Sequence, residues 1–310
     1  MSDSINPTAP ATDATNDGIR SKPITVHIVT DSSCDLPAEI ADDLDISIVP
    51  LTIRFGDEEF VDRKELSTAE FWTRCVKSDT LPETAAPAPG HFELTYRSAA
   101  ANGATGVIVV SLSSALSATM QSAQLAARTI TDDPSIDLDV RVIDSRTLTM
   151  GLGTIVLACA RAARGGATID QVEALAHDLV DRTRVFGALD TLENLKKGGR
   201  IGNAKALLAT ALSIKPIIEV TGGVVEHAGK QRTRSKALAY LVDKVQSYHG
   251  NIENLAVLHA DCSDVDLFVE MLGRTGHIVI DDIVIGEIGP VIGTHGGRGT
   301  IGVAFQVTRP

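Results

Sequence analysis

Three apolar runs, each followed by a hydroxyl-rich turn and then by a helical pattern, constrain the fold of this chain most strongly. The runs are Ile24–Thr30, Gly106–Leu112 and Val140–Asp144. The middle run reads GVIVVSL and is apolar on both faces, which is typical of a strand inside a parallel sheet. Strands that alternate with helices in this way predict a parallel α/β domain with right-handed crossovers.

The second half of the chain has a different order of elements. Two β-type runs, Lys215–Val220 and Val224–Ala228, flank a Thr-Gly-Gly turn and predict a hairpin. Helices and strands then alternate up to a last strand, Thr300–Val307, which indicates an α+β domain with a mixed sheet. We therefore expect an α/β fold of two domains. The predicted divisions are a disordered tail over residues 1–22, an N-terminal parallel α/β domain over 23–165 and a C-terminal α+β domain over 166–310.

Composition excludes several classes of protein. The 310 residues carry a formal net charge of -12 and only 4% are aromatic, which argues against a nucleic-acid binder. No apolar run approaches the length of a membrane span, and the N-terminus lacks the apolar core of a secretory signal. The four cysteines form no CxxC and the eight histidines are scattered, so we expect no metal centre. A cytoplasmic location follows as an expectation.

Hydroxyl side chains follow three of the predicted strands at the point where each strand ends. Ligands of parallel α/β sheets bind beyond the carboxyl ends of the strands, and helix N-termini attract anions. We expect a helix to start directly after Ser114. Because Ser and Thr are also ordinary helix caps, an anion site and simple capping remain open alternatives. The segments concerned are Thr30–Ser33, Ser111–Ser114 and Asp144-Ser145.

Basic residues concentrate between positions 196 and 236. This segment holds nine lysines and arginines against Glu219 and Glu226, whereas the whole chain is acidic. Arg200 stands out because glycines flank it and allow its backbone to approach a ligand closely. Since arginine suits carboxylate and phosphate groups, Arg200 and Arg232 are candidate anion-binding residues. A solvated basic face is the alternative for most of the segment.

A glycine-rich stretch, Gly289–Gly302, is predicted to be a loop. It contains a literal GxGxxG, but a strand follows it instead of a helix, so we reject a dinucleotide site. His295 lies in this stretch near Arg298. A histidine in such a place can be structural, can donate to an anion or can shuttle a proton.

Seven stretches of the chain, taken together, resemble the DegV family. The resemblance runs from about residue 24 to residue 308, and its motifs share the order and spacing of that family. The stretches are Thr30–Pro37 (TDSSCDLP), Thr84–Gly90, Leu112–Ala123 (LSSALSATMQSA), Leu192–Gly202 (LENLKKGGRIG), Ile214–Val220 (IKPIIEV), Arg232–Ala237 and Gly293–Val303.

This resemblance implies a fatty-acid-binding protein that encloses a long acyl chain in a buried tunnel and holds its carboxylate at the cleft between two domains. It also implies that the protein acts as the carrier subunit of a bacterial fatty-acid kinase. It implies no catalysis by the chain itself and no cofactor apart from the bound long-chain fatty acid. The partners implied are the separate kinase, which makes an acyl-phosphate, and a membrane surface touched peripherally during lipid exchange. The residues carried over are Thr84, Ser113, Ser114 and His295 for the carboxylate, Arg200 and Arg232 for the headgroup and the kinase step, and Ser32 and Arg298 as further cleft contacts.

Several residues depart from the family pattern near the expected site. Ala85 and Ala86 replace a serine and a glutamine, Ala118 replaces a glycine, and Arg298 adds a charge. These changes bear on the identity of the ligand and on coupling to a kinase.

Two other functions stay open from the sequence. One is a serine-dependent acyl hydrolase or transferase that uses Ser114 with His295, and the other is a regulatory protein. The tunnel wall cannot be read from the sequence, because its candidates suit an ordinary core equally well. These candidates are Phe92, Leu116, Met120, Ile214 and Phe305.

Overall fold

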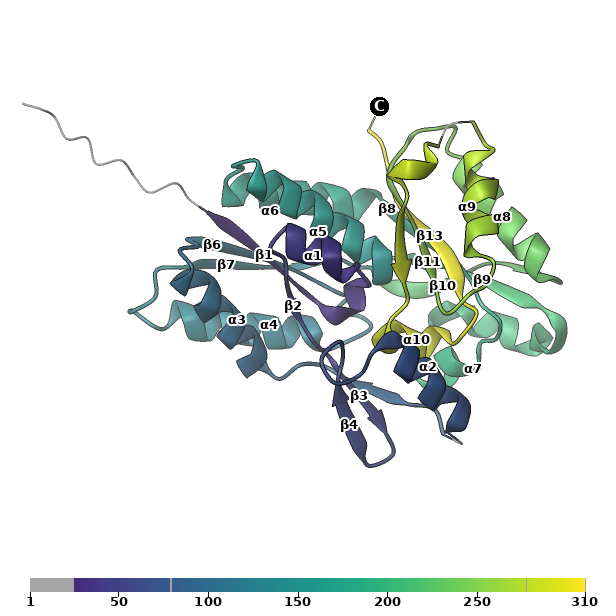
Figure 1. Ribbon diagram of the computed structural model, residues 1–310, viewed down its shortest axis with the longest axis horizontal. Helices are drawn as coiled ribbons and strands as arrows, with labels where there is room; N and C mark the ends of the chain where they lie inside the picture. The colour runs from purple at the N-terminus through teal and green to yellow at the C-terminus, as the bar shows by residue number, and fades with distance from the viewer. Residues whose placement is uncertain (1–24, 79, 277, 310) are drawn as a thin grey trace, which may run out of the picture.

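The structure is a computed structural model that describes residues 25–309 except residues 79 and 277, and it leaves out the side chains of residues 208–213. The predicted tail over residues 1–22 lies outside the described residues. Two sheets stand side by side in Figure 1, with the N-terminal sheet in blue and purple and the C-terminal sheet in green and yellow.

The N-terminal sheet has four parallel strands. In spatial order they are β2 (Ser47–Val49), β1 (Val26–Asp31), β6 (Gly106–Ser111) and β7 (Asp139–Asp144). Every residue of β6 is buried, as its two apolar faces predict. The parallel α/β prediction for this half is confirmed.

The C-terminal sheet has six strands and is mixed, as predicted. In spatial order they are β10 (Val224–Gln231), β9 (Lys215–Thr221), β8 (Thr183–Ala188), β13 (Ile301–Val307), β11 (Ile252–His259) and β12 (Val284–Glu287). Only the β11–β12 pair is parallel among these described strands. The hairpin predicted around the Thr-Gly-Gly turn is β9–β10.

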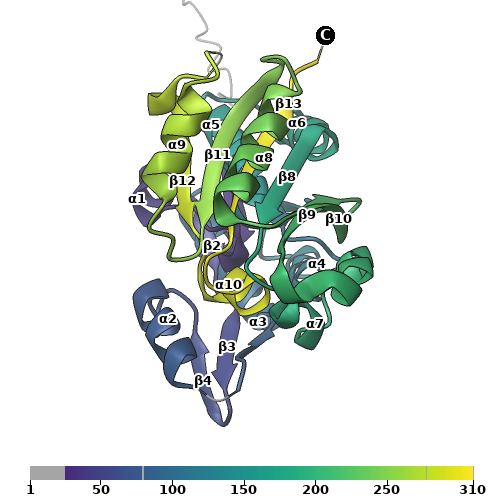
Figure 2. The same cartoon turned by 90° about the vertical axis from the view of Figure 1, so that its right-hand side faces the viewer.

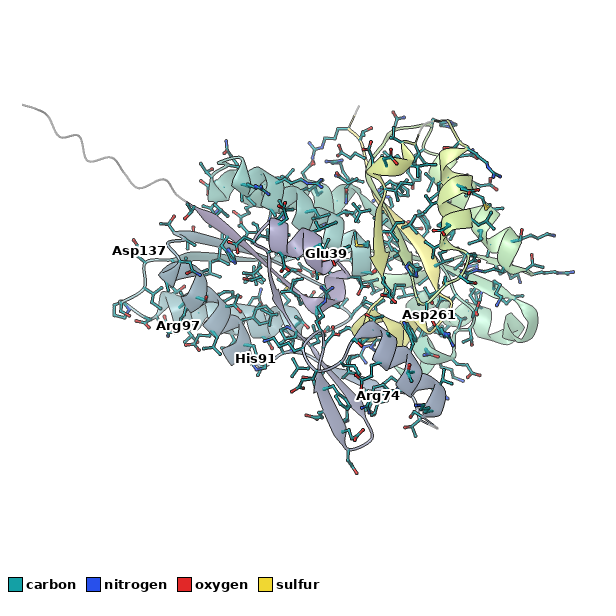
Figure 3. All side chains as sticks on the ribbon, viewed as in Figure 1. Glu39, Arg74, His91, Arg97, Asp137 and Asp261 are labelled. Carbon is teal, nitrogen blue, oxygen red and sulfur yellow. The ribbon has the colours of Figure 1, made fainter. Side chains whose placement is uncertain are left out.

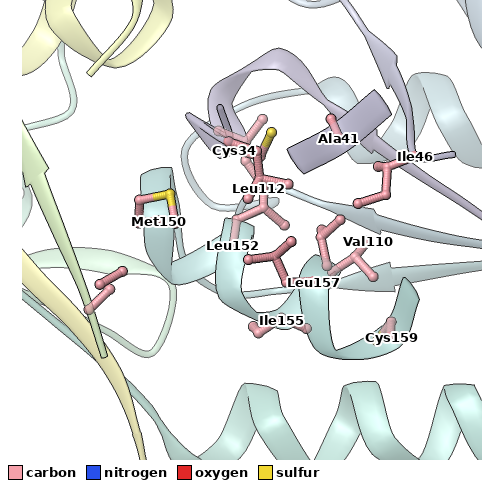
Figure 4. Packing of buried hydrophobic residues seen from close by; sticks show 14 of the residues in the cluster. Cys34, Ala41, Ile46, Val110, Leu112, Met150, Leu152, Ile155, Leu157 and Cys159 are labelled. Atoms are coloured by element: carbon pink, nitrogen blue, oxygen red, sulfur yellow. The ribbon is translucent and has the colours of Figure 1, made fainter. Parts of the chain in front are cut away.

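Helix α5 (Thr149–Arg164) lies between the two sheets. Eleven of its 16 residues are buried, because a helix packed on both sides needs apolar or small residues all round. Figure 4 shows Leu152, Ile155 and Leu157 of this helix packed beside Val110 and Leu112 of the N-terminal sheet. The two sheets therefore share one continuous core across α5.

Other helices cover the outer faces of both sheets. Helices α3 (Pro89–Ala101) and α4 (Thr119–Thr131) pack on the N-terminal sheet, and α8 (Arg234–Gln246) and α9 (Val265–Gly273) on the C-terminal sheet (Figures 1 and 2). Helix α6 (Ile169–Arg182) follows position 165 in the chain yet packs on α5, β6 and β7. The domain boundary near residue 165 stays a prediction.

Three local predictions around the site are wrong, and each error has a physical cause. The helix expected directly after Ser114 begins only at Thr119. A turn comes first, in which the Ser113 carbonyl oxygen accepts hydrogen bonds from the Leu116 and Ser117 amides. The segment Leu81–Gly90 holds three prolines, which predict a loop, yet it contains strand β5 (Glu83–Ala85). Pro82 and Pro87 flank the pairing residues without interrupting them.

The third error concerns the glycine-rich stretch. Its first half is a short helix, α10 (Pro290–Gly296), with Pro290 at the first helical position, where a proline is already pre-set for a helix. Strand β5 joins β3 (Thr52–Phe55) and β4 (Glu58–Val61) in a small antiparallel sheet. As Figure 1 shows, this sheet and helix α2 (Thr68–Lys77) lie below the two main sheets, next to α10.

Candidate functional site

An apolar cavity lies where the carboxyl edge of the N-terminal sheet meets the inner face of the C-terminal sheet. Its volume is about 1040 Å³ when its opening to solvent is included. The wall is mainly aliphatic and comes from both halves of the chain. Among its residues are Leu112, Leu116, Val185, Leu189, Ile218 and Leu258. Such a wall suits a hydrocarbon chain.

Three polar side chains stand together at one end of this cavity: Thr84, Arg200 and His295. Thr84 Oγ1 and His295 Nε2 are 3.0 Å apart and share a hydrogen bond, although 211 positions separate them in the chain. Strand β5 places Thr84, which pairs with Ile53 of β3, and α10 places His295. The structure thus brings together three residues that the sequence had suggested from distant segments.

His295 is held as a neutral imidazole. Burial, with a smaller contribution from the positive charge of Arg200, lowers the pKa of His295 to about 4. The ring packs over Gly198, where an added Cβ would lie only 2.3 Å from His295 Nδ1. Glycine at position 198 therefore makes room for the imidazole. A neutral histidine can donate one hydrogen bond without titrating near neutral pH.

Arg200 joins the two halves of the chain at the same point. Its Nε donates to the Leu116 carbonyl oxygen at 3.2 Å, and its Nη1 donates to the Gly198 carbonyl oxygen at 2.6 Å. These contacts fix the guanidinium beside the opening of the cavity. Its planar set of donors suits a carboxylate or a phosphate.

A second, polar hollow begins at the same three side chains. Thr84, Arg200 and His295 line it together with Asn194 and Lys197, and its volume is about 830 Å³ with its opening. Asn194 and Lys197 belong to the short helix α7 (Glu193–Lys197). The polar group of Thr84, Arg200 and His295 therefore stands between an apolar cavity and an open, polar hollow.

The two predicted serines have other partners. Ser113 is buried, and its Oγ donates to the Gly223 carbonyl oxygen at 2.7 Å. Ser114 is exposed, and its Oγ donates to Asp144 Oδ2 at 2.5 Å. Neither serine lines the cavity, and within the described residues no hydrogen bond joins Ser114 to His295. The arrangement lacks the serine–histidine contact that an acyl hydrolase would need.

The other three predicted residues lie outside the polar group. Arg232 is exposed in the turn after β10 and lines neither hollow. Ser32 is buried, and its Oγ accepts a hydrogen bond from the Leu51 amide at 3.0 Å. Arg298 is exposed and donates to Asp261 Oδ2 at 2.6 Å, and Figure 3 labels Asp261 on the C-terminal side of the molecule.

Sequence reasoning missed Ser117, Asn194 and Lys197 as site residues. Ser117 lines the cavity two positions before α4, and its Oγ accepts from the Thr119 amide at 3.3 Å. The Ser-x-Thr spacing at this helix start could have identified it. Of the tunnel candidates, Leu116 lines the cavity, whereas Phe92 and Phe305 are buried in the cores on the outer faces of the two sheets.

The residues that the structure describes contain no group of three or more histidine, cysteine, aspartate or glutamate side chains able to hold a metal ion. They also contain no helix that is long and apolar enough to cross a membrane.

Comparison with known sequences identifies the family. The profile of a family described as "Uncharacterised protein, DegV family COG1307" matches residues 25–308. The chain belongs to the DegV family. A DegV domain-containing protein of Streptomyces coelicolor is 36% identical over 91% of this chain and 98% of its own length. A Mycobacterium tuberculosis relative of the same description is 34% identical over 92% of this chain and 98% of its own length.

Solved structures of DegV proteins have the same fold. A structure from Thermus thermophilus, described as showing fatty acid binding of a DegV family protein, has a TM-score of 0.84 at 30% identity and covers 92% of this chain and 100% of its own. A stearic acid-binding protein from Eubacterium ventriosum has a TM-score of 0.84 at 26% identity and covers 91% of this chain and 98% of its own. DegV from Bacillus subtilis, described as a fatty acid binding protein, has a TM-score of 0.80 at 26% identity, covering 92% and 100%.

Proposed function

We propose that this DegV protein binds one long-chain fatty acid and presents its carboxylate to a separate kinase in the cytoplasm. The observation that carries the proposal is the aliphatic cavity that ends at Thr84, Arg200 and His295. The acyl chain occupies the cavity, and the carboxylate lies at the three polar side chains. The descriptions of the DegV structures from Thermus thermophilus and Eubacterium ventriosum support the ligand class.

Apolar burial supplies the affinity in this proposal. A buried methylene contributes about 0.8 kcal/mol, so about 15 of them contribute roughly 12 kcal/mol before the costs of ordering and association. The polar group then fixes which end of the ligand faces outward. Beside the carboxylate, the neutral His295 ring donates its Nε2–H to Thr84 Oγ1, which leaves the Thr84 hydroxyl free to donate to the carboxylate. Arg200 supplies the opposite charge.

The polar hollow beyond the carboxylate suits the kinase step. In that step the kinase transfers the terminal phosphoryl group of ATP to a carboxylate oxygen, which gives an acyl-phosphate and ADP. Arg200 and Lys197 line this hollow and offset the added negative charge, while the chain itself contributes no catalytic group. Exposed Arg232 is assigned to contact with the kinase, and Ser113 and Ser114 to holding the surrounding loops.

Titration of delipidated protein with stearate tests the binding half of the proposal. Replacing Thr84 by Val keeps the shape and removes one donor to a charged group, so we expect stearate affinity to fall roughly 10- to 100-fold. Thr73→Val on the exposed face of α2 is the matched control and leaves affinity unchanged. Equal affinity of the Thr84→Val variant and the wild type would contradict the assignment of the carboxylate.

A second assay tests the carrier half. Stearate-loaded protein is incubated with ATP and a bacterial fatty-acid kinase, and hydroxylamine traps any acyl-phosphate as the hydroxamate. We expect hydroxamate from loaded protein and none from delipidated protein. A loaded protein that gives no product with the kinases of its own organism would remove the carrier role and leave lipid binding standing.

A further inference from the structure

Gly187 occupies an unusual position in the wall of the cavity. It lies inside β8, between β9 and β13, and it is buried. A glycine inside a central strand weakens the strand and often marks a place where a ligand or another backbone comes close. The atoms around the position of the missing Cβ distinguish these two causes.

The backbone does not explain this glycine. The nearest neighbours of a Cβ built at position 187 would be side-chain atoms of Ile218 and Leu189, at 3.6 Å and beyond, which is ordinary contact. Its cross-strand partner Gly302 is different, because a Cβ there would lie 2.2 Å from the Phe186 carbonyl oxygen. Gly302 is required by close packing of backbones, whereas Gly187 could carry a side chain without strain in the folded protein.

The direction of that absent side chain is toward the cavity. Residues of a strand alternate between the two faces of its sheet. Val185 and Leu189, two positions to either side of Gly187, both line the cavity, while Phe186 and Ala188 belong to the core on the outer face. Among the described strand residues that line the cavity, Gly187 alone has no side chain.

We infer that Gly187 determines the length and bulk of the acyl chain that the cavity accepts, an inference that rests on the proposed fatty-acid function. The room above this residue admits methylenes that an aliphatic side chain would displace. Acids long enough to reach β8 therefore depend on position 187, and shorter acids do not. The glycine destabilises the central strand but leaves this space for the ligand.

Two substitutions test the inference with saturated fatty acids of 10 to 20 carbons and delipidated protein. Gly187→Val fills the room, so we expect affinity for the longest acids to fall by about fourfold for each displaced methylene, with little change for the shortest. Gly187→Ala fits without strain and reduces affinity for the longest acids less. Gly90→Ala is the matched control, because a Cβ there meets nothing within 4 Å and Gly90 is exposed near the start of α3.

Thermal unfolding separates this role from a structural one. Both Gly187→Ala and Gly90→Ala reduce the freedom of the unfolded chain, so both should raise the melting temperature of the delipidated protein. Only Gly187→Ala should weaken binding of long acids. Parallel chain-length profiles for the wild type and the position-187 variants would overturn the inference. A wild type that binds none of the acids would instead overturn the proposed function.

Discussion

Replacing Gly198 by Ala tests directly how the polar group is built. The backbone at Gly198 has φ near -73°, which alanine adopts readily. The obstacle is the imidazole of His295, since the new Cβ would lie 2.3 Å from Nδ1 and 2.9 Å from Cε1. The ring must move, and its 3.0 Å hydrogen bond to Thr84 must lengthen or break.

The size of the effect follows from two opposing contributions. Overfilling a packed site costs about 1–3 kcal/mol, and the stiffer unfolded chain returns about 0.4–1 kcal/mol. We expect the free energy of unfolding to fall by about 1–2 kcal/mol in the wild-type background. Affinity for stearate should fall as well, because His295 leaves its place at the carboxylate.

A double-mutant cycle measured by urea unfolding of delipidated protein isolates the contact. With His295→Ala already present, the two closest contacts of the new Cβ are gone, and the next nearest atom is the Asn194 carbonyl oxygen at 3.1 Å. Gly198→Ala should then cost little, which gives a coupling of about 1–2 kcal/mol between the two positions. An equal loss of stability in both backgrounds would refute the placement of the imidazole over Gly198.

Three further predictions concern buried polar groups. Burial raises the pKa of Asp35 from 3.8 to about 7, so the free energy of unfolding should fall as pH rises from about 4 to 7. Denaturant titrations of Asp35→Asn should show a smaller fall over this range. An unchanged pH dependence in the variant would contradict the prediction. Folding lowers the pKa of His295 from 6.5 to about 4, so the stability that the neutral ring contributes is lost as pH drops from 6.5 to 4. NMR should find the imidazole still neutral at pH 5.5. A protonated ring at that pH would contradict the prediction. Ser113→Ala should cost about 1–3 kcal/mol by stranding the Gly223 carbonyl oxygen, and exposed Ser114→Ala less than about 1 kcal/mol; equal losses in urea unfolding would count against the buried contact.

The order of strands and helices could be predicted from the sequence, because the spacing of apolar residues along the chain reflects which faces are buried. The all-apolar run of β6 predicts a strand buried on both faces, and the Thr-Gly-Gly turn predicts the β9–β10 hairpin. Short elements that are stabilised by residues far away in the chain could not be predicted in this way. Strand β5 exists because Thr84 pairs with Ile53 of β3, and three nearby prolines obscured it.

The site was predictable only in part for a similar reason. Arg200 and His295 stood out from their glycine-rich surroundings, whereas Thr84 was found through family resemblance. The contact between Thr84 and His295 spans 211 positions, and no local pattern contains it. The position of Ser113 and Ser114 after a predicted strand, together with the family resemblance, selected them as site residues. The helix after them begins only at Thr119, and their hydroxyls have other partners.

Native mass spectrometry of the purified protein tests the central claim most directly. The account predicts a complex heavier than the chain by one long-chain fatty acid, which organic solvent removes and added stearate restores at a ratio of one to one. Methyl stearate, which has the same chain without the charged carboxylate, should restore it poorly because Arg200 then has no opposite charge to bind. A protein that carries no lipid and takes up no stearate after delipidation would contradict the account.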